Sequence, residues 1–209
     1  YMNFTSKDVM DLRARTGVGM MDCKKALVES DGDMEKAIEI LREKGMATGA
    51  KRAGKIASQG IVDAYTEGNV SVLVEVNCES DFVARGEQFK EFVQKIAAYI
   101  ASANPADVQA INDANSDLIN ETVAKIGEKI VVRRFERYVT DGGKISTYIH
   151  MGGKIGVMVE TDAIASDEVA HDIALHIAAV NPSYICSSEI PAEVVEKESE
   201  ISKSQLLNE

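Results

Sequence analysis

Cysteine is scarce in this 209-residue sequence, and the three that occur, Cys23, Cys78 and Cys186, do not form a Cys-x-x-Cys pair. An odd number of widely spaced cysteines argues against a disulfide framework and against a structural zinc site. We therefore expect three buried free thiols that act as small apolar side chains.

Long hydrophobic runs are also missing. No window approaches the roughly 18 consecutive apolar residues that a membrane-spanning helix needs. The first residues are charged and helix-favouring, and they lack the basic-then-apolar order of a secretory signal. The sequence therefore predicts a cytoplasmic protein with no membrane partner.

The common signatures of catalysis are absent as well. The sequence has no Walker phosphate loop, no strand-associated Gly-x-Gly-x-x-Gly, no nucleophile elbow and no His-Glu-x-x-His pair. On a helix, His171 and His176 would point about 140° apart and could not bind one metal ion together. We expect neither an enzyme nor a bound cofactor or metal, and a hydrolase that uses Cys78 and His150 is the weak alternative.

Basic residues become rare after the N-terminal region. Residues 1–60 carry 11 Lys and Arg against 9 Asp and Glu, whereas residues 61–209 carry 12 against 25. An anionic body repels phosphate backbones, so direct binding to nucleic acid is not expected. We expect protein partners instead.

Residues 1–45 predict three short helices. Thr5 or Ser6 can cap the first helix, Asp22 the second and Asp33 the third. The apolar positions of these helices supply a small core: Val9, Leu12, Ala26, Leu27, Ala37, Ile38 and Leu41. Because so small a module is only marginally stable by burial alone, we expect it to be a docking unit. Residues 46–60 are rich in Ala, Gly and basic residues, which predicts a linker, helical in part, rather than a core element.

The rest of the chain reads as a duplicated unit. "GNVSVLVEV" (68–76) parallels "GKIGVMVET" (153–161), and each segment is followed by a helix that ends in Asn-Pro. Alternate apolar residues predict one buried face on each strand. These residues are Val70, Val72 and Val74 in the first copy and Ile155, Val157 and Val159 in the second.

Between the two copies, residues 128–139 predict a strand that turns at 140–143 into a return strand over 144–150. We expect an α+β core of two related subdomains, 61–140 and 141–190, with antiparallel strands and helices packed on one face. A helical tail over 191–209 is expected to be incomplete.

The first copy is eight residues longer than the second, and the extra residues fall around "ESDFVARG" (79–86). An insertion between a strand and a helix is a common position for functional side chains. Asp81 and Phe82 have two interpretations: a cap and hydrophobic staple for the helix near Glu87, or an exposed acidic and aromatic anchor for a partner. His150, at a bend beside Met-Gly-Gly, is either another partner contact or a turn residue without a function.

Two long segments, "LRARTGVGMMDCKKAL" (12–27) and "VEVNCESDFVAR" (74–85), resemble the signatures of the elongation factor Ts family, the guanine-nucleotide exchange factors of bacterial translation. Ser80 stands where threonine is commoner in the family. "VAKIGEKIVVRR" (123–134) and "HMGGKIGV" (150–157) agree as well, and the resemblance covers residues 3–200. It implies a three-helix module similar to ubiquitin-associated (UBA-like) domains and a core of two subdomains. It also implies a GTPase partner, elongation factor Tu, from which bound GDP is released.

The resemblance also implies contact residues. Asp81 and Phe82, with Val83 in the same signature, would enter the GTPase beside its magnesium site. The nucleotide domain of the GTPase would be contacted by Arg13, Met20, Met21 and Lys24. His150 would engage another domain of the GTPase, and Gly127 matches a position near the contact surface where a structural role is equally expected.

Family members usually continue into a helical hairpin and a further helical module, so a homodimer would use regions largely absent here. The alternative from a different class is an adaptor, in which the helical module binds proteins without exchanging any nucleotide.

Overall fold

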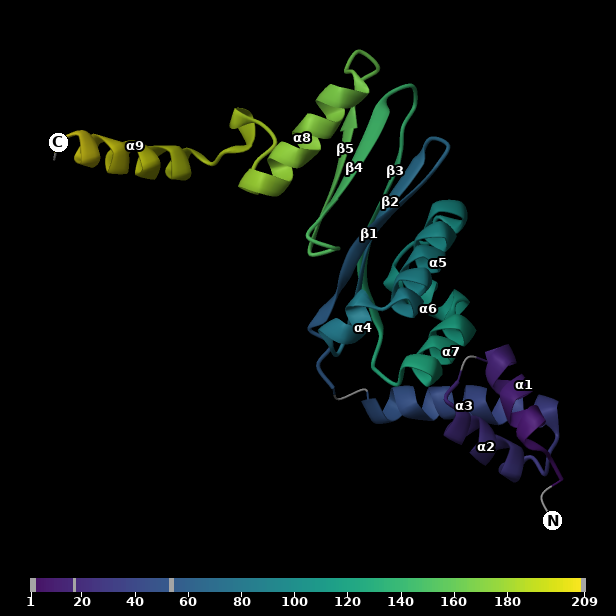
Figure 1. The fold of residues 1–209 in the computed structure, drawn as a ribbon. Helices are drawn as coiled ribbons and strands as arrows, with labels where there is room; N and C mark the ends of the chain where they lie inside the picture. The colour runs from purple at the N-terminus through teal and green to yellow at the C-terminus, as the bar shows by residue number, and fades with distance from the viewer. Residues whose placement is uncertain (1–2, 17, 53–54, 208–209) are drawn as a thin grey trace.

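The computed structural model describes residues 3–16, 18–52 and 55–207, with the backbone alone for residues 46–52. It confirms the predicted α+β class: three N-terminal helices precede a core with antiparallel strands (Figure 1). In the described chain, no helix combines the length and the apolar character that crossing a membrane would require.

The N-terminal module consists of α1 (Ser6–Thr16), α2 (Met20–Glu29) and α3 (Met34–Arg52). Its buried core contains Val9, Leu12, Val18, Cys23, Ala26, Leu27, Ala37 and Leu41, with Ile38 packed against it at partial exposure. Helix α3 continues past residue 45 into the segment predicted to be a linker.

Two of the three predicted helix caps are confirmed. Thr5 Oγ1 accepts from the N–H of Asp8 at 3.3 Å, and Asp33 Oδ1 accepts from the N–H of Lys36 at 3.0 Å. The prediction for Asp22 is wrong, because α2 begins two residues earlier and Gly19 occupies its N-cap. Asp22 lies in the first turn instead, where a negative charge still suits the helix dipole.

The first sheet contains β1 (Gln59–Glu67), β2 (Val70–Cys78) and β3 (Val131–Val139), antiparallel throughout in the order β1-β2-β3. Strand β1 was not predicted, although the "EGN" turn at 67–69 followed by an alternating strand is a hairpin signal. Alternation along β2 buries Val72 and Val74 as predicted, and Val76 with them, whereas Val70 is half-buried at the start of the strand.

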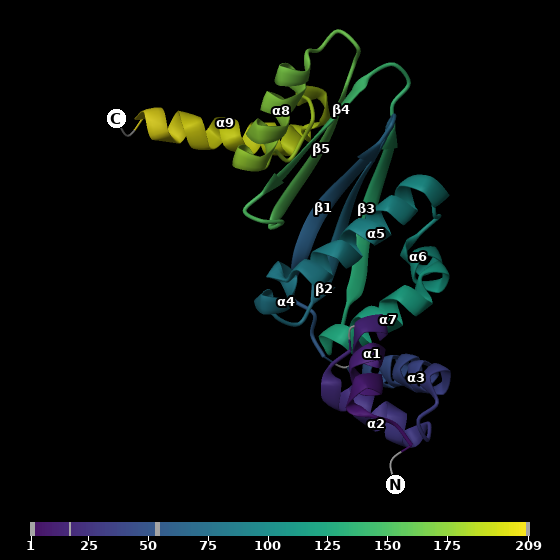
Figure 2. The same cartoon turned by 45° about the vertical axis from the view of Figure 1, so that its right-hand side comes forward.

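Helices cover one face of this sheet. After β2 the chain forms α4 (Asp81–Arg85) and α5 (Glu87–Ala103), and then α6 (Val108–Ala114) and α7 (Ser116–Ile126). Helix α5 lies along β1 and β2 and contributes more buried residues to the core than any other element: Phe89, Phe92, Val93, Ile96, Ala97, Ile100 and Ala101. Figure 2 shows α5 across the sheet, with α6 and α7 beside it.

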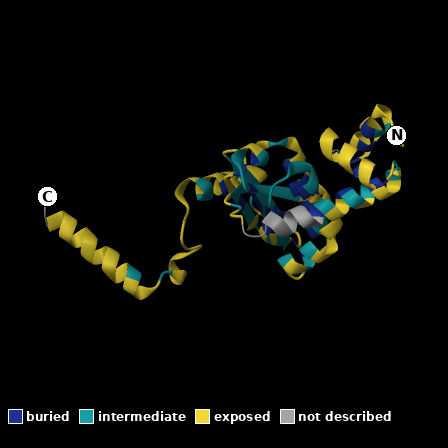
Figure 3. Ribbon diagram, turned by 90° about the horizontal axis from the view of Figure 1, so that it is seen from below, coloured by how far each residue is buried: buried dark blue, intermediate teal, exposed yellow. Residues whose placement is uncertain are grey.

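A second unit lies on the opposite side of the sheet. Strands β4 (Lys144–His150) and β5 (Ile155–Thr161) form an antiparallel pair that is covered by α8 (Asp167–Val180). The chain then passes through a 3-10 turn (Ser187–Glu189) into α9 (Ala192–Leu207), which has no buried residue along its described length. Figure 3 shows α9 as an exposed helix extending away from the body.

The helices of the two predicted copies, α5 and α8, end in the same way. Asn104 after α5 and Asn181 after α8 both adopt the left-handed conformation, with φ of 48° and 47°, and each precedes proline. On the second strand, Val157 is buried and Val159 is half-buried, as the alternation predicts. Ile155 is an exception with 38% exposure, because it lies at the start of β5 beside the exposed turn.

The predicted hairpin between residues 128–139 and 144–150 is wrong. Strand β3 pairs with β2, and β4 pairs with β5 in a separate sheet. After β3, the N–H of Thr140 donates to Asn69 O at 3.0 Å, and Asn69 Nδ2 donates to Thr140 O at 3.0 Å. These bonds hold the end of β3 to the β1–β2 turn, so the following glycines carry the chain over to the second sheet.

Glycines allow the two sheets to approach closely. A Cβ on Gly156 would lie 2.5 Å from Val62 Cγ1, and one on Gly153 would lie 2.7 Å from Ile61 Cβ. Gly153 also accepts a hydrogen bond at its carbonyl from the N–H of Val62, at 2.8 Å. The β4–β5 turn is therefore seated directly on β1.

The N-terminal module packs against the core through α3 and α7. Gly45 lies so close to α7 that a side chain there would collide with the carbonyl of Asn120 and approach Ala124 Cβ to 3.1 Å. Arg42 Nη2 and Asp117 Oδ2 form an ion pair of 2.7 Å across the same contact. The module is thus docked on the core in this structure.

The expectation of three buried thiols holds for Cys23 and Cys78 but is wrong for Cys186, which is exposed. Cys186 lies in the segment between α8 and α9, where almost every residue is exposed, so no core is available to it.

Candidate functional site

The inserted stretch forms a helix of its own. Ser80 adopts an extended conformation, with φ −119° and ψ 155°, and its Oγ accepts from the N–H of Val83 at 3.4 Å. Gly86 ends α4 and also occupies the N-cap of α5. Asp81 is therefore not the cap of the helix that starts at Glu87, contrary to the first of the two interpretations.

Helix α4 has an inner and an outer face. Ala84 is 3% exposed, and Val83 packs at partial exposure against the main core. Phe82 lies on the outer face and is 85% exposed. It is consequently not a hydrophobic staple, and its ring is available to another molecule.

Asp81 lies beside Phe82 at the first turn of α4. Its carboxylate forms an ion pair of 3.3 Å with Arg85 Nη2, and both side chains are open to solvent. Exposed pairs of this kind contribute little, because water screens the charges and the long side chain loses freedom. Asp81 can therefore exchange Arg85 for another polar partner at small cost.

A pair of carboxylates joins the segment before α4 to the segment after α7. Glu128 Oε2 accepts from the N–H groups of Glu79 and Ser80 at 3.0 and 2.9 Å, and its Oε1 accepts from Ser80 Oγ at 2.6 Å. In return, Glu79 Oε1 accepts from the N–H of Lys129 at 2.7 Å. We call these four hydrogen bonds the carboxylate clamp. Sequence reasoning missed it, because its two segments lie 48 to 50 residues apart.

Gly127 makes the clamp geometry possible. It ends α7 in the left-handed conformation, with φ of 77°, and a Cβ there would meet no atom within 4 Å. The backbone conformation, rather than a lack of space, accounts for glycine at this position. This turn directs the next residue, Glu128, toward Ser80.

The residues implied on the N-terminal module form a separate surface. Arg13 on α1 and Met20, Met21 and Lys24 on α2 are all exposed, the two methionines at 46% and 66%. Helices α1 and α2 lie toward the opposite end of α3 from α4 (Figure 1). The structure therefore does not gather these residues with Phe82 into one site.

His150 ends β4 at the turn that rests on β1. Its Nδ1 lies 2.7 Å from the hydroxyl of Tyr148, and the two rings are tilted with centroids 5.6 Å apart. His150 is half-buried, while the following Met151 is 70% exposed with a positive φ of 51°. Met151, which sequence reasoning did not select, is therefore more open to a partner than His150.

Cys78 is unsuited to nucleophilic chemistry. Its side chain is fully buried at the end of β2, and burial, with the nearby charge of Glu128, raises the pKa of the thiol to about 11. A thiol with this pKa is uncharged at neutral pH, whereas the thiolate is the reactive form. The hydrolase alternative therefore loses its nucleophile.

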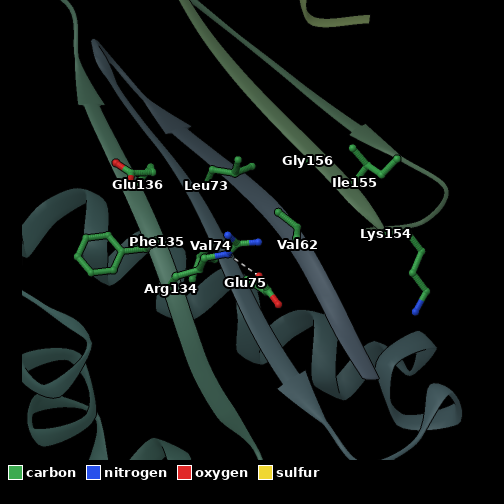
Figure 4. A pocket seen from close by; sticks show the side chains of 10 residues that line it. All are labelled: Val62, Leu73, Val74, Glu75, Arg134, Phe135, Glu136, Lys154, Ile155 and Gly156. Carbon is green, nitrogen blue, oxygen red and sulfur yellow. Dashed lines mark hydrogen bonds and ion pairs between the residues drawn. The ribbon is translucent and has the colours of Figure 1, made fainter. Parts of the chain in front are cut away.

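A groove of about 370 Å³ lies between the two sheets (Figure 4). Within it, Glu75 accepts from Arg134 at 2.7 Å and from Arg133 at 3.1 Å. Burial disfavours the charged form of Glu75, but the hydrogen bonds and charges of the two arginines outweigh it and lower the pKa of this carboxyl. The lining residues come from β1, β2, β3, the β4–β5 turn and the start of β5, with none from α4, so the groove is distinct from the surface around Phe82.

Comparisons with known proteins agree with the resemblance of the two signatures. The sequence model of the family described as "Elongation factor TS" matches residues 79–209. The Elongation factor Ts of Symbiobacterium thermophilum is 50% identical over 98% of this chain and 71% of the relative. Those of Halothermothrix orenii and Clostridium perfringens are each 46% identical, over 100% and 98% of this chain and 74% and 72% of the relatives.

Proposed function

The chain belongs to the elongation factor Ts family, and we propose that it is a guanine-nucleotide exchange factor that binds elongation factor Tu and promotes the release of GDP. We further propose that Asp81 and Phe82 perform the exchange by inserting next to the magnesium site of the GTPase. The activity is driven by protein binding, with no covalent step. As a translation factor, the protein would act in the cytoplasm.

The exposure of Phe82 is the observation that supports this mechanism best. Aromatic side chains that fill a pocket of the partner are typical hot spots of protein interfaces. An 85% exposed phenylalanine on a helix anchored by Val83 and Ala84 is available for such a contact without rearrangement of the core. Fixing the anchor before binding reduces the entropy lost on association.

The proposed displacement acts on the groups that hold GDP. Bound nucleotide leaves a GTPase slowly because the phosphate oxygens, the metal and the backbone N–H groups reinforce one another. The ring of Phe82 would separate elements that support the magnesium site, and Asp81 would compete for polar partners there. The weak, solvent-exposed pair with Arg85 leaves Asp81 free to do so.

Other contacts would supply the binding energy for this distortion. The exposed side chains of Arg13, Met20, Met21 and Lys24 offer apolar and cationic groups to the nucleotide domain. The turn at His150 would contact a further domain of the GTPase. Because α3 is packed on α7, the module and α4 can engage one partner as parts of a single body.

Linkage makes the effect reciprocal. If this protein lowers the affinity for GDP by some factor, GDP lowers the affinity for this protein by the same factor. Each tenfold change corresponds to about 1.4 kcal/mol. GTP, in excess in the cell, can then occupy the emptied site and release the exchange factor.

A stopped-flow assay tests the proposal. Purified elongation factor Tu is loaded with fluorescent GDP and mixed with excess unlabelled GDP, with and without this protein. We expect release to accelerate with the concentration of the protein and then to saturate. Binding to the GTPase without any acceleration would support the adaptor alternative and would overturn the proposed function.

A further inference from the structure

We propose that Glu128 is a positioning residue for nucleotide exchange: its carboxylate fixes residues 79–80, so that α4 presents Phe82 in a single orientation. This inference rests on the proposed function. It concerns a residue that would not itself touch the nucleotide or the metal.

Helix α4 needs such support because it is very short. It contains five residues, whereas isolated helices below roughly 12 to 15 residues are marginal in water. Among its described residues, Ala84 and Val83 are those that pack on the core, whereas Phe82 is 85% exposed. The remaining contacts that hold its N-terminal end are those of Ser80 and the residue before it.

Glu128 controls the helix cap through the orientation of one hydroxyl. Ser80 Oγ donates its hydrogen to Glu128 Oε1 at 2.6 Å, which turns an oxygen lone pair toward the N–H of Val83. Without the carboxylate, this hydroxyl could rotate and donate elsewhere. The cap of α4 therefore depends on a side chain that follows α7.

The two backbone bonds of the clamp fix the direction in which α4 leaves the sheet. Glu128 Oε2 accepts from two successive N–H groups, those of Glu79 and Ser80. Hydrogen bonds to an ionised carboxylate are shorter and stronger than those between neutral groups. With Glu79 bonded in turn to the backbone of Lys129, the segments before α4 and after α7 are tied in both directions.

The location of Glu128 gives the clamp a wider role. Glu128 follows α7, and α7 packs on α3 through the contact at Gly45. The same helix therefore supports the N-terminal module and, through the clamp, the segment that carries Phe82. This arrangement keeps the two proposed contact surfaces at a fixed separation.

The first test compares Glu128→Ala, Glu128→Gln and the matched control Glu121→Ala in the GDP release assay. Glu121 is an exposed carboxylate on α7 that pairs with Lys125, on the same helix, at 3.3 Å. We expect Glu128→Ala to reduce the maximal release rate about tenfold, equivalent to roughly 1.4 kcal/mol, with little change in the half-saturating concentration. Glu128→Gln should restore part of the rate, because its carbonyl can still accept from the backbone, and the control should match the wild type.

A double-mutant cycle shows whether Glu128 acts through Phe82. If it does, Glu128→Ala should have little further effect on the maximal rate once Phe82→Ala is present. Full additivity of the two changes would overturn the inference, as would a wild-type rate in Glu128→Ala alone.

Hydrogen exchange on the isolated protein separates failure of the inference from failure of the proposed function. In Glu128→Ala we expect the amides of Glu79, Ser80 and Val83 to exchange at least about tenfold faster. The amides of Phe92 and Ile96 in α5 should keep their protection, which shows that the core is folded. If the wild-type protein does not accelerate the release of GDP from elongation factor Tu, the proposed function is wrong. Unchanged protection of residues 79–83 in Glu128→Ala would overturn the inference about Glu128 independently of that result.

Discussion

Gly45 of α3 lies directly against the backbone carbonyl of Asn120 on α7, so the distance between the N-terminal module and the core is set by the absence of a side chain. The side chains of the neighbouring ion pair Arg42–Asp117 are 53% and 82% exposed, so this pair contributes far less to the stability of the contact than the close packing at Gly45 does. The close approach of the two helices is therefore the feature that a substitution can test.

Gly45→Ala should destabilise the protein despite improving helix propensity. Alanine gains about 1 kcal/mol over glycine inside a helix, but a Cβ at this position meets a backbone atom that cannot move aside, and overpacking typically costs about 1 to 3 kcal/mol. We expect a lower melting temperature and faster hydrogen exchange in α3. Arg42→Ala, the comparison variant, should change the free energy of unfolding by less than about 1 kcal/mol, and a stabilised Gly45→Ala would show that the helices are not in close contact.

Phe82→Ala should reduce exchange and leave stability unchanged. The side chain is 85% exposed, so its removal should change the free energy of unfolding by no more than about 0.5 kcal/mol. The maximal rate of GDP release should fall by at least about tenfold, or roughly 1.4 kcal/mol. Ile164→Ala, at a residue that is 91% exposed, is the matched control and should release GDP at the wild-type rate. Equal rates in both variants would contradict the proposed insertion of Phe82 next to the magnesium site.

Asp81→Asn should slow nucleotide exchange, and Arg85→Ala shows whether the cause is the lost charge of Asp81 or the lost ion pair. Both changes break the ion pair of 3.3 Å, but only the first removes the charge that we propose competes near the magnesium site. We expect a reduced release rate for Asp81→Asn and a near wild-type rate for Arg85→Ala in the same stopped-flow assay. A loss of similar size in the two variants would assign the effect to the ion pair itself.

Cys186 and Cys78 should differ sharply in their reactivity toward iodoacetamide. Cys186 is exposed, and a hydrogen bond with Ser188 lowers the pKa of its thiol, so it should be alkylated first in native protein. Cys78 should resist at neutral pH, because burial raises the pKa of its thiol to about 11. Mass spectrometry of native and denatured samples measures this order, and rapid native labelling of Cys78 would contradict its buried position.

The raised pKa of Cys78 also predicts how the stability of the protein changes with pH. The pKa of Cys78 is higher in the folded protein than its ordinary value of 9.0, so its contribution to stability is fully present below pH 9. Stability should fall as the pH rises from about 9 to about 11, since the unfolded thiol ionises first. Chemical denaturation over this range should show a smaller decline for Cys78→Ala than for wild type.

Local patterns predicted the elements that depend on neighbouring residues. The apolar spacing in residues 1–45 and the repeated Asn-Pro endings identified helices that the structure contains. The insertion around Phe82 was found because one copy is longer than the other, and its exposure then came from the structure. These features depend on periodicity and helix termination, which a short segment determines by itself.

Features that join distant segments were not predictable in the same way. Glu128 reaches Ser80 across 48 residues, and no local pattern distinguishes it from other charged residues near a helix end. The hairpin expected after β3 was wrong because Thr140 is held by Asn69, a contact that only the assembled β1–β2 turn provides. Ile155 followed the alternation of a buried strand, but its place beside the exposed turn leaves it partly in solvent.

The close seating of β4 and β5 on β1 links the stability of the second unit, β4, β5 and α8, to that of the first sheet. Among the described residues of β4, β5 and α8, only Val157, Ala170 and Ala174 are buried apolar side chains. The burial of three side chains cannot outweigh the conformational entropy that is lost when three elements become ordered. The second unit therefore depends on its contact with the first sheet for its stability. A larger residue at position 153 or 156 would therefore separate β4 and β5 from β1 and destabilise the whole second unit, although neither glycine contributes a side chain to a core.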